Sequence, residues 1–423
     1  MTAPDVHHAI VEVWKREAAM LVASLTRVVR DVGLAEELAQ DALVAALEVW
    51  PTSGVPDRPG AWLMTTARNR ALNQLRHRKL AERKHETMAH ERDTDHDVRA
   101  ALEASLDQVV PDDVLRLMFI ACHPVLTRDA RVALTLRLLG GLSTDEIARA
   151  FLVPEPTIAQ RIVRAKRTLA DAGVAFELPP AAELSARLAS VLEVVYLIYN
   201  EGYLASAGDD LLRPALQDEA LRLGTLLAGL APDEPEVLGL VALMELQASR
   251  AGARTDAAGE PVLLLEQDRT RWDRARIARG LAALAAAETR SGEPGPYQLQ
   301  AAIAACHARA TTADDTDWAR IAALYGELGA RQPSPVIELN RALAVSRAEG
   351  PAAGLALLDA LNAVPAMARY HPLPAARADL LERLGDLAAA RAEFERAASL
   401  TENARQRQRL LARAAACGRT ARA

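Results

Sequence analysis

Apolar residues recur at spacings of three and four along most of the chain, which is the period of an amphipathic helix. The clearest stripe consists of Leu34, Leu38, Ala42, Ala45 and Val49. A stretch rich in Pro, Gly and Ser at 51–60 breaks this pattern, and residues 62–78 resume it. Valine-rich alternating runs typical of strands are scarce, so we predict an all-α protein.

The pattern divides the chain into three helical blocks and a linker. Residues 1–84 and 105–178 each have the length of a small helical domain. Between them, residues 85–104 carry charges of both signs and few apolar anchors, as expected of a linker. After a pair of prolines, residues 181–423 form a long helical extension.

The extension contains a weak internal repeat. Residues 350–358 match residues 385–393 at an offset of 35, close to the tetratricopeptide period of about 34 residues. We expect stacked pairs of helices, whose extended surfaces suit peptides or flat partners.

Composition agrees with helix and limits the class of protein. Half of the residues are apolar, yet only 4% are aromatic, and the helix formers Ala, Leu and Arg dominate. Three cysteines do not make a disulfide framework. No charge-free apolar stretch approaches the roughly 20 residues that span a bilayer, and the N-terminus lacks the layout of a secretory signal. We expect a cytoplasmic protein without membrane contact.

Charge is distributed unevenly around a net value of -6. Residues 31–57 hold six acids and no Lys or Arg, whereas residues 68–84 hold seven basic residues and one acid. Four further basic residues fall in 161–167. An acidic face beside two basic ones suits a protein that grips both another protein and DNA; the plain alternative is solvated helix faces.

A helix-turn-helix is predicted at 143–167. Ser143 and Glu146 have capping-box spacing, and Pro156 suits the first turn of the second helix. The predicted inner faces consist of Ile147, Ala148 and Phe151 in the first helix and Ile158 and Ile162 in the second. The residues predicted to contact bases and phosphates are Thr157, Gln160, Arg161, Arg164, Lys166 and Arg167. Two packed helices with a basic exterior are the alternative.

Two earlier helices carry chemistry of other kinds. The helix at 62–78 presents amide and guanidinium groups that suit bases and phosphates, namely Arg68, Asn69, Asn73, Arg76 and Lys79. Trp62 suits stacking on an unpaired base, although burial is the commoner fate of tryptophan. The helix at 34–50 is acidic and ends at a tryptophan; its polar residues are Glu36, Glu37, Gln40, Asp41 and Glu48.

The order of acidic helix, turn-rich loop, Asn/Arg-rich helix, linker and helix-turn-helix resembles the extracytoplasmic-function sigma factors of the sigma-70 family. Residues 32–50 resemble the core-binding helix of region 2, and residues 61–76 resemble its promoter-melting helix. The helix-turn-helix resembles region 4, which binds the -35 element. Beyond Pro180 the chain is similar to the subgroup with a tetratricopeptide-like extension, through residues 200–203, 272–274 and 295–303.

This resemblance implies two partners, core RNA polymerase and promoter DNA, and no catalytic residue, cofactor or metal. Region 2 would dock on the clamp helices of the largest polymerase subunit, and region 4 would meet the flap of the second-largest subunit. The implied polymerase contacts are Glu36, Glu37, Gln40, Asp41 and Trp50. The implied -10 contacts are Trp62, Arg68, Asn69, Asn73, Arg76 and Lys79, with the loop at 51–60 capturing a flipped base.

The sequence departs from the family at two positions of the helix-turn-helix. Leu152 stands in the turn where the family often has Gly, and a left-handed conformation there would cost about 1–2 kcal/mol. Ala159 replaces a basic residue that is common in the second helix.

For the extension we predict regulation, either by packing on regions 2 and 4 or by binding a small regulatory protein. The residues expected on its surface are Asn200, Glu201, Tyr203, Trp272, Asp273, Tyr297 and Gln298. Cys122-His123 and Cys306-His307 lack partners at metal-ligand spacing. Two other functions stay open: a one-component helix-turn-helix regulator with a helical sensor domain, and a helical scaffold.

Overall fold

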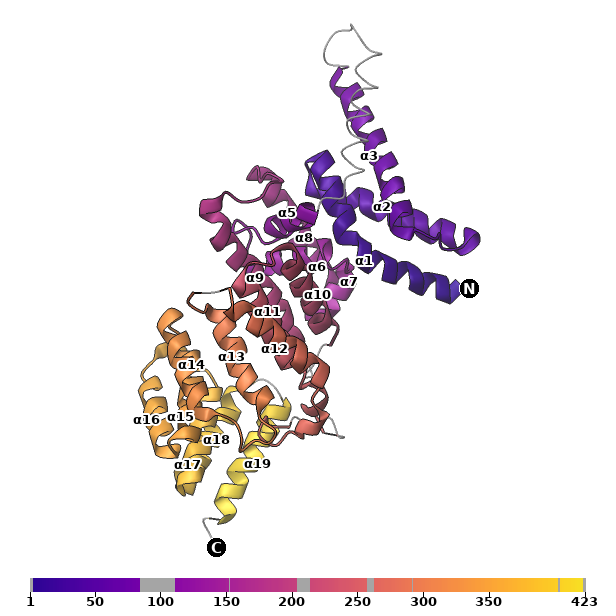
Figure 1. Ribbon diagram of the computed structural model, residues 1–423. Helices are drawn as coiled ribbons and strands as arrows, with labels where there is room; N and C mark the ends of the chain where they lie inside the picture. Colours follow the sequence, from indigo (N-terminus) through magenta and orange to yellow (C-terminus); the bar gives the residue numbers. More distant parts are fainter. Residues whose placement is uncertain are drawn as a thin grey trace. The chain divides into compact units, whose positions relative to one another are not determined.

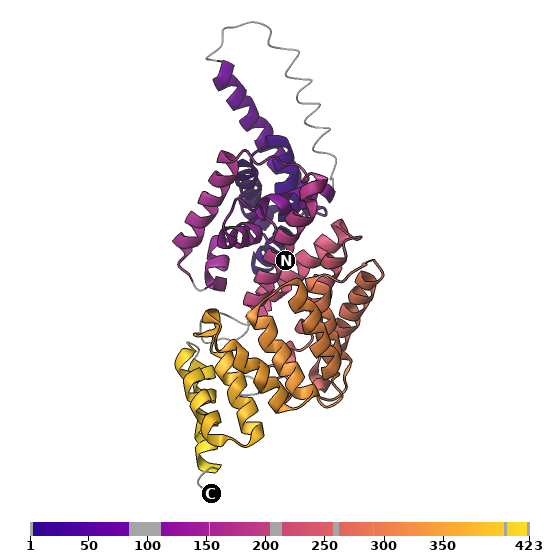
Figure 2. The ribbon, with the colours of Figure 1, turned by 90° about the vertical axis from the view of Figure 1, so that its left-hand side faces the viewer.

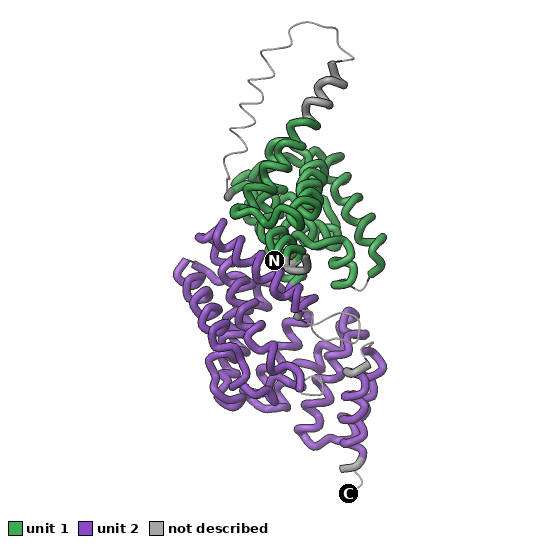
Figure 3. Tube along the Cα trace, turned by 90° about the vertical axis from the view of Figure 1, so that its right-hand side faces the viewer, with its two compact units in different colours: residues 1–198 green, residues 199–423 purple. Residues whose placement is uncertain are grey.

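The chain is built from helices, as predicted. The computed structural model describes residues 3–83, 111–151, 153–203, 214–256, 262–290, 292–401 and 404–420, and these contain no strand. They fold into two compact units, residues 1–198 and 199–423 (Figures 1 and 3). The linker expected at 85–104 and Leu152 lie outside the described residues. None of the described helices is long and apolar enough to cross a membrane.

The first block of unit 1 consists of three helices. They are α1 (Ala3–Val29), α2 (Val32–Ser53) and α3 (Pro59–Arg83), and each contacts the other two. Asp31 starts α2 by accepting a hydrogen bond from the backbone N–H of Leu34 at 3.0 Å, the usual role of an N-cap aspartate. Leu25, Leu38 and Leu63, one from each helix, are almost fully buried.

The apolar stripe of α2 is confirmed for four of its five residues. Val49 is the exception, because it is 41% exposed. The helix also continues through Pro51 to Ser53, so the predicted break at 51–60 is shorter than expected. It ends at Gly54, whose φ of 84° favours glycine and whose N–H donates to the carbonyl of Trp50.

The second block of unit 1 contains four short helices. They are α5 (Pro111–Ala121), α6 (Arg128–Leu138), α7 (Thr144–Phe151) and α8 (Glu155–Asp171). The apolar side chains of Leu117, Leu134, Ile147 and Ile158 are fully buried among them.

The following helix, α9 (Ala181–Tyr203), contacts this second block, and its residues up to Ile198 belong to unit 1. The hydroxyl of Ser190 donates to the carbonyl of Cys122 at 2.7 Å, and Arg187 donates to the carbonyl of Phe119 at 3.1 Å. The chain was expected to enter the extension at residue 181, but it divides within α9 instead, after Ile198. Gly202 lies inside the last turn of α9.

Unit 2 is a series of stacked helices (Figures 1 and 2). Its α-helices are α10 (Pro214–Leu230), α11 (Pro235–Ala248), α12 (Arg274–Glu288), α13 (Pro296–Arg309), α14 (Trp318–Arg331), α15 (Pro335–Ala348), α16 (Pro351–Leu361), α17 (Pro372–Leu384), α18 (Leu387–Leu400) and α19 (Ala404–Thr420). The short 3-10 helices are η1 (Ala251–Ala253), η2 (Arg269–Arg271) and η3 (Pro365–Met367). Each α-helix contacts the next along the chain, as in a solenoid of helix pairs.

The repeat found in the sequence maps onto equivalent helices. Its two copies begin α16 and α18, the second helices of the successive pairs α15–α16 and α17–α18. Each copy starts at a glycine of positive φ, 107° at Gly350 and 85° at Gly385. That conformation strains other L-residues, so the glycines explain why the match begins at these positions.

Two residues expected on the surface of the extension are buried, and for them the prediction was wrong. Trp272 is 2% exposed. The guanidinium carbon of Arg269 lies over the indole of Trp272, 4.9 Å from the centroid of the ring. Gln298, also 2% exposed, closes a helix start by accepting the N–H of Gly295 at 3.0 Å. Asp273 is exposed as predicted and caps α12.

Asn200, Glu201 and Tyr297 are half-buried, and the side chain of Tyr203 lies outside the described residues.

Candidate polymerase and nucleic-acid interfaces

The helix-turn-helix forms as the sequence predicts. Ser143 and Glu146 bond reciprocally: the hydroxyl accepts the N–H of Glu146 at 3.1 Å, and the carboxylate accepts the N–H of Ser143 at 2.8 Å. Pro156 lies in the first turn of α8, while Ile158 and Ile162 are buried beneath it. These local contacts fix the entry of both helices and hold the outer face of α8 toward solvent.

That outer face carries polar groups suited to DNA. Thr157, Gln160 and Arg164 are exposed on α8. Arg161 is half-buried and pairs with Asp129 of α6 at 3.2 Å. Arg167 pairs with Asp171 one turn on, but both are largely exposed, and such pairs contribute little.

Lys166 does not share this face. It follows Thr157 by nine residues, about two and a half helical turns, which places it on the opposite side of α8. There its ammonium pairs with the carboxylate of Glu36 in α2. The sequence grouped Lys166 with the DNA contacts, and the structure separates it from them.

The exposed face of α3 is amide-rich. Asn69 and Asn73 lie one turn apart and both face solvent, with Thr65 one turn earlier. Arg68 is half-buried, and the side chains of Arg76 and Lys79 lie outside the described residues. Thr65 was not predicted as part of this face, although it precedes Asn69 by four residues in the sequence.

Trp62 makes an edge-on contact with Trp50, with ring centroids 5.3 Å apart and planes at 68°. Trp50 is almost fully buried, so its indole serves as core rather than as a surface contact for polymerase. Trp62 is half-buried and retains some accessible surface. The prediction for Trp50 as an exposed contact was therefore wrong.

The solvent face of α2 combines acids with an exposed valine. Glu37, Asp41, Val44 and Glu48 follow one line along the helix, because their spacings are three and four. All four are exposed, and Val44 is 50% exposed. Asp41 approaches Arg70 of α3 at 3.3 Å. Val44 was not singled out from the sequence, since an apolar residue in a helix is usually expected inside.

Glu36 was expected among these surface acids, but it is 5% exposed. Its carboxylate accepts hydrogen bonds from Gln40, from Arg137 of α6 at 2.6 Å and from Lys166 of α8. Glu36 therefore joins the first block of unit 1 to the second. We call Glu36, Arg137 and Lys166 the Glu36 cluster.

Two further contacts join the same blocks. Arg27 of α1 pairs with the buried carboxylate of Asp113 in α5 at 2.9 Å. The indole N–H of Trp14 donates to the carbonyl of Gly141 at 3.0 Å. Residues 3–83 and 111–198 thus pack into one unit through charged and polar contacts.

Comparison with known families assigns both blocks. Residues 13–80 match sigma-70 region 2, and residues 116–169 match sigma-70 region 4. Residues 187–288 match a family of unknown function (DUF6596).

Several curated proteins are similar to the chain. An uncharacterized protein of Rhizobium meliloti (strain 1021) is 45% identical over 90% of each chain. The ECF RNA polymerase sigma factor SigK of Mycobacterium ulcerans (strain Agy99) is 31% identical over 34% of this chain and 75% of its own. The probable ECF RNA polymerase sigma factor SigI of Mycobacterium tuberculosis (strain CDC 1551 / Oshkosh) is 27% identical over 41% of this chain and 59% of its own. No solved structure gives a significant match.

The matches to SigI and SigK cover 41% and 34% of this chain, whereas the Rhizobium relative covers 90% of it and therefore includes most of the extension. The helix-turn-helix, the three-helix block before it and the two region matches agree with one another. The chain belongs to the extracytoplasmic-function sigma factors of the sigma-70 family.

Proposed function

We propose that the chain docks on core RNA polymerase through α2, holds the melted -10 element on α3 and reads the -35 element with α8. The extension regulates this activity. The observation that carries the proposal is the presence of three separate exposed faces, each on the helix that its region would use.

The line Glu37, Asp41, Val44 and Glu48 on α2 supports the polymerase contact. The exposed side chain of Val44 lies between carboxylates. This arrangement fits a partner surface on which basic side chains surround an apolar side chain. The partner surface in this proposal is the clamp helices of the largest subunit, while region 4 meets the flap of the second-largest subunit.

The faces of α3 and α8 support the DNA contacts. Asn69 and Asn73 offer both donors and acceptors to the edges of unpaired bases. Thr157 and Gln160 lie in the first turns of α8, the part of a recognition helix that meets base edges, and Arg164 is positioned for phosphate. The loop before α3 captures a flipped base, at a cost of a few kcal/mol that the contacts must repay.

Simultaneous binding of both elements requires the two blocks to separate. Positions -35 and -10 differ by about 25 base pairs, or about 85 Å at roughly 3.4 Å per base pair. In the structure α2 and α8 are in direct contact through Glu36 and Lys166. Among the described helices of the unit the longest, α1 with 27 residues, is only about 40 Å long. The contacts of the Glu36 cluster must therefore break when the chain engages a whole promoter.

Transcription with sigma-free core polymerase on the promoter upstream of its own gene tests the proposal. We expect start-site-specific RNA from the wild-type chain and none from a Glu37→Lys, Asp41→Lys variant. The matched control is Asp314→Lys, Glu349→Lys, which changes the net charge equally at exposed positions of unit 2. Wild-type chain that binds no core polymerase would contradict the proposal, and specific promoter binding without polymerase would favour a one-component regulator.

Removal of residues 199–423 tests regulation. This cut is preferred to one at residue 181, because residues 181–198 pack with the N-terminal unit. Equal promoter activity and equal expression of the short and full chains would show that the extension does not regulate.

A further inference from the structure

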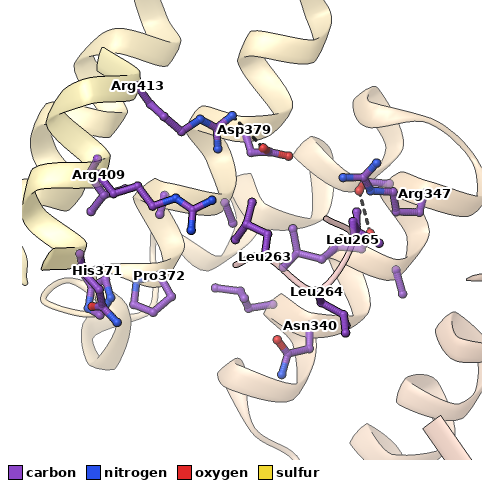
Figure 4. Close-up of a pocket in the computed structure, with 18 of the residues that line it drawn as sticks. Leu263, Leu264, Leu265, Asn340, Arg347, His371, Pro372, Asp379, Arg409 and Arg413 are labelled. Atoms are coloured by element: carbon purple, nitrogen blue, oxygen red, sulfur yellow. Dashed lines mark hydrogen bonds and ion pairs between the residues drawn. The ribbon is translucent and has the colours of Figure 1, made fainter. Parts of the chain in front are cut away.

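Unit 2 contains a cavity of about 660 Å³. It lies among helices α13, α14, α15, α17, α18 and α19 and the loop that precedes η2 (Figure 4). Sites for small molecules usually have about 300–1,000 Å³, so this cavity has the size of a ligand site. Neither the region 2 nor the region 4 match includes its residues.

Most of the cavity wall is apolar. Leu339 and Leu343 of α15 line one part of it, and Leu263 and Leu265 come from the loop. The loop is anchored by two hydrogen bonds, from the N–H of Val262 to the carbonyl of Arg254 at 2.8 Å, and from the amide of Gln267 to the carbonyl of Val262 at 3.2 Å. In the view of Figure 4 the labelled leucines of the loop lie between Arg409 and Arg347.

Arginines supply the charge of the cavity. Arg413 is already paired with Asp379 at 3.0 Å and with Glu382, and it also covers the ring of Phe394. Arg409 faces Glu266 at 3.6 Å. Both guanidinium groups thus have carboxylate partners within the protein.

Arg347 is different. Within the part of the chain that the structure describes, no carboxylate lies within ion-pair distance of its guanidinium, and it is exposed on the cavity wall. The pKa of Arg383 is lowered first by burial and then by the nearby charge of Arg347, while the carboxylate of Asp379, which already pairs with Arg413, raises it. Two like charges side by side leave a local positive excess, which an anion would neutralise.

The two histidines of the wall do not add to that charge at neutral pH. Burial lowers the pKa of His307 to about 4, with Arg250 and Arg269 acting in the same direction. Burial also lowers the pKa of His371. The positive charge near the cavity therefore comes from arginine and persists across the physiological pH range.

We propose that this cavity binds a small amphipathic carboxylic acid, with its apolar body against the leucines and its carboxylate on Arg347. A compact molecule fits better than a peptide. Each peptide residue brings an N–H and a C=O that need partners, and a wall that is mostly apolar leaves many such groups unpaired.

Isothermal titration of the full-length chain tests this with three probes that share one apolar tail. They are decanoate and decyltrimethylammonium, each used below its micelle concentration, and 1-decanol, used below its solubility limit. We expect decanoate to bind at least about tenfold more tightly than the other two, since a hydrogen bond to a charged group is worth about a tenfold or greater change in affinity. Equal binding of all three probes, or no binding of decanoate, would overturn the proposal.

Variants locate the site. Arg347→Gln should weaken decanoate binding about tenfold and leave 1-decanol unchanged. Arg341→Gln is the matched control on the same helix, because Arg341 pairs with Glu338 and does not line the cavity. Leu263→Asp, at a side chain that is 44% exposed and so tolerant of change, should repel decanoate from the opposite wall. Decanoate binding that is insensitive to both Arg347→Gln and Leu263→Asp would refute the assignment.

A synthetic peptide of alternating Leu and Glu is the competing ligand. If it binds and decanoate does not, the cavity is a peptide site and the proposal is wrong. All of these titrations omit polymerase and DNA, so their outcome is independent of whether the chain initiates transcription.

Discussion

The Glu36 cluster makes a sharp prediction about how unit 1 opens. Replacing Glu36 with Gln keeps the size of the side chain but removes the negative charge between Arg137 and Lys166. Two cations then face each other across a neutral amide. We expect the blocks at 3–83 and 111–198 to separate more readily.

The size of the effect follows from burial. Removing one partner of a buried ion pair costs about 3–5 kcal/mol. The side chains of Arg137 and Lys166 remain 17% and 20% exposed, so water screens part of the loss and the lower end, about 3 kcal/mol, applies. At about 1.4 kcal/mol per factor of ten, the equilibrium between closed and separated blocks should shift about a hundredfold.

Pulsed electron resonance measures the separation directly. Genetically encoded spin labels at Glu48 and Arg164, which are exposed on α2 and α8, report the distance between the blocks without using the native cysteines. Glu36→Gln should add a population at longer distance. Glu37→Gln, one residue along and exposed, should leave the distribution unchanged.

A double-mutant cycle gives the coupling energy. In the Arg137→Gln background, Glu36→Gln should cost clearly less than in the wild-type chain, because the pair is already broken. An unchanged distance distribution in Glu36→Gln, together with additive effects on unfolding, would refute the view that this carboxylate holds the blocks together.

Three other predictions concern stability. Asp113→Asn should lower the free energy of unfolding by about 3 kcal/mol in urea denaturation, because it leaves the guanidinium of Arg27 without its buried carboxylate. The lowered pKa of His307 means that the unfolded chain binds more protons between pH 6.5 and about 4, so stability should fall as pH drops through this window. The loss is at most about 3.5 kcal/mol at roughly 1.4 kcal/mol per pKa unit, and a His307→Gln variant should lose less over the same range in calorimetry. Gly354→Ala should lower the free energy of unfolding by about 1–3 kcal/mol, and the melting temperature with it, because the added Cβ would lie 2.4 Å from the Cβ of Ser346.

Matched controls separate these effects from general damage. Asp112→Asn removes an exposed carboxylate beside Asp113 and should change stability by less than about 0.5 kcal/mol. Gly326→Ala adds a methyl group to α14 where nothing lies within 4 Å, and should be neutral or stabilising. If Gly354→Ala behaves like Gly326→Ala, the close packing of α15 on α16 is not the reason for glycine there.

Features set by neighbouring residues could be predicted from the sequence. The capping box of Ser143 and Glu146 needs only three residues of chain, and the structure contains both of its hydrogen bonds. The helical class and the order of the elements followed from periodicity for the same reason. The exposed amides Asn69 and Asn73 were also found this way.

Features that depend on distant parts of the chain could not be predicted. Glu36 looks like Glu37 in the sequence, yet its partners are 101 and 130 residues away. Trp50 lies in the last turns of an amphipathic helix, and only the packing of three helices decides that its ring lies inside. The wall of the cavity in unit 2 consists of residues from six helices and a loop, so no local sequence pattern predicts the cavity.

The equivalence of α16 and α18 has a consequence for how such chains vary over evolution. Each helix pair touches mainly its neighbours along the stack, so the gain or loss of one whole pair leaves the remaining contacts intact. A gap of a few residues inside a pair would instead turn a buried helix face toward solvent. Homologous extensions should therefore differ in length mainly by steps of about 35 residues, with breakpoints near glycines such as Gly350 and Gly385.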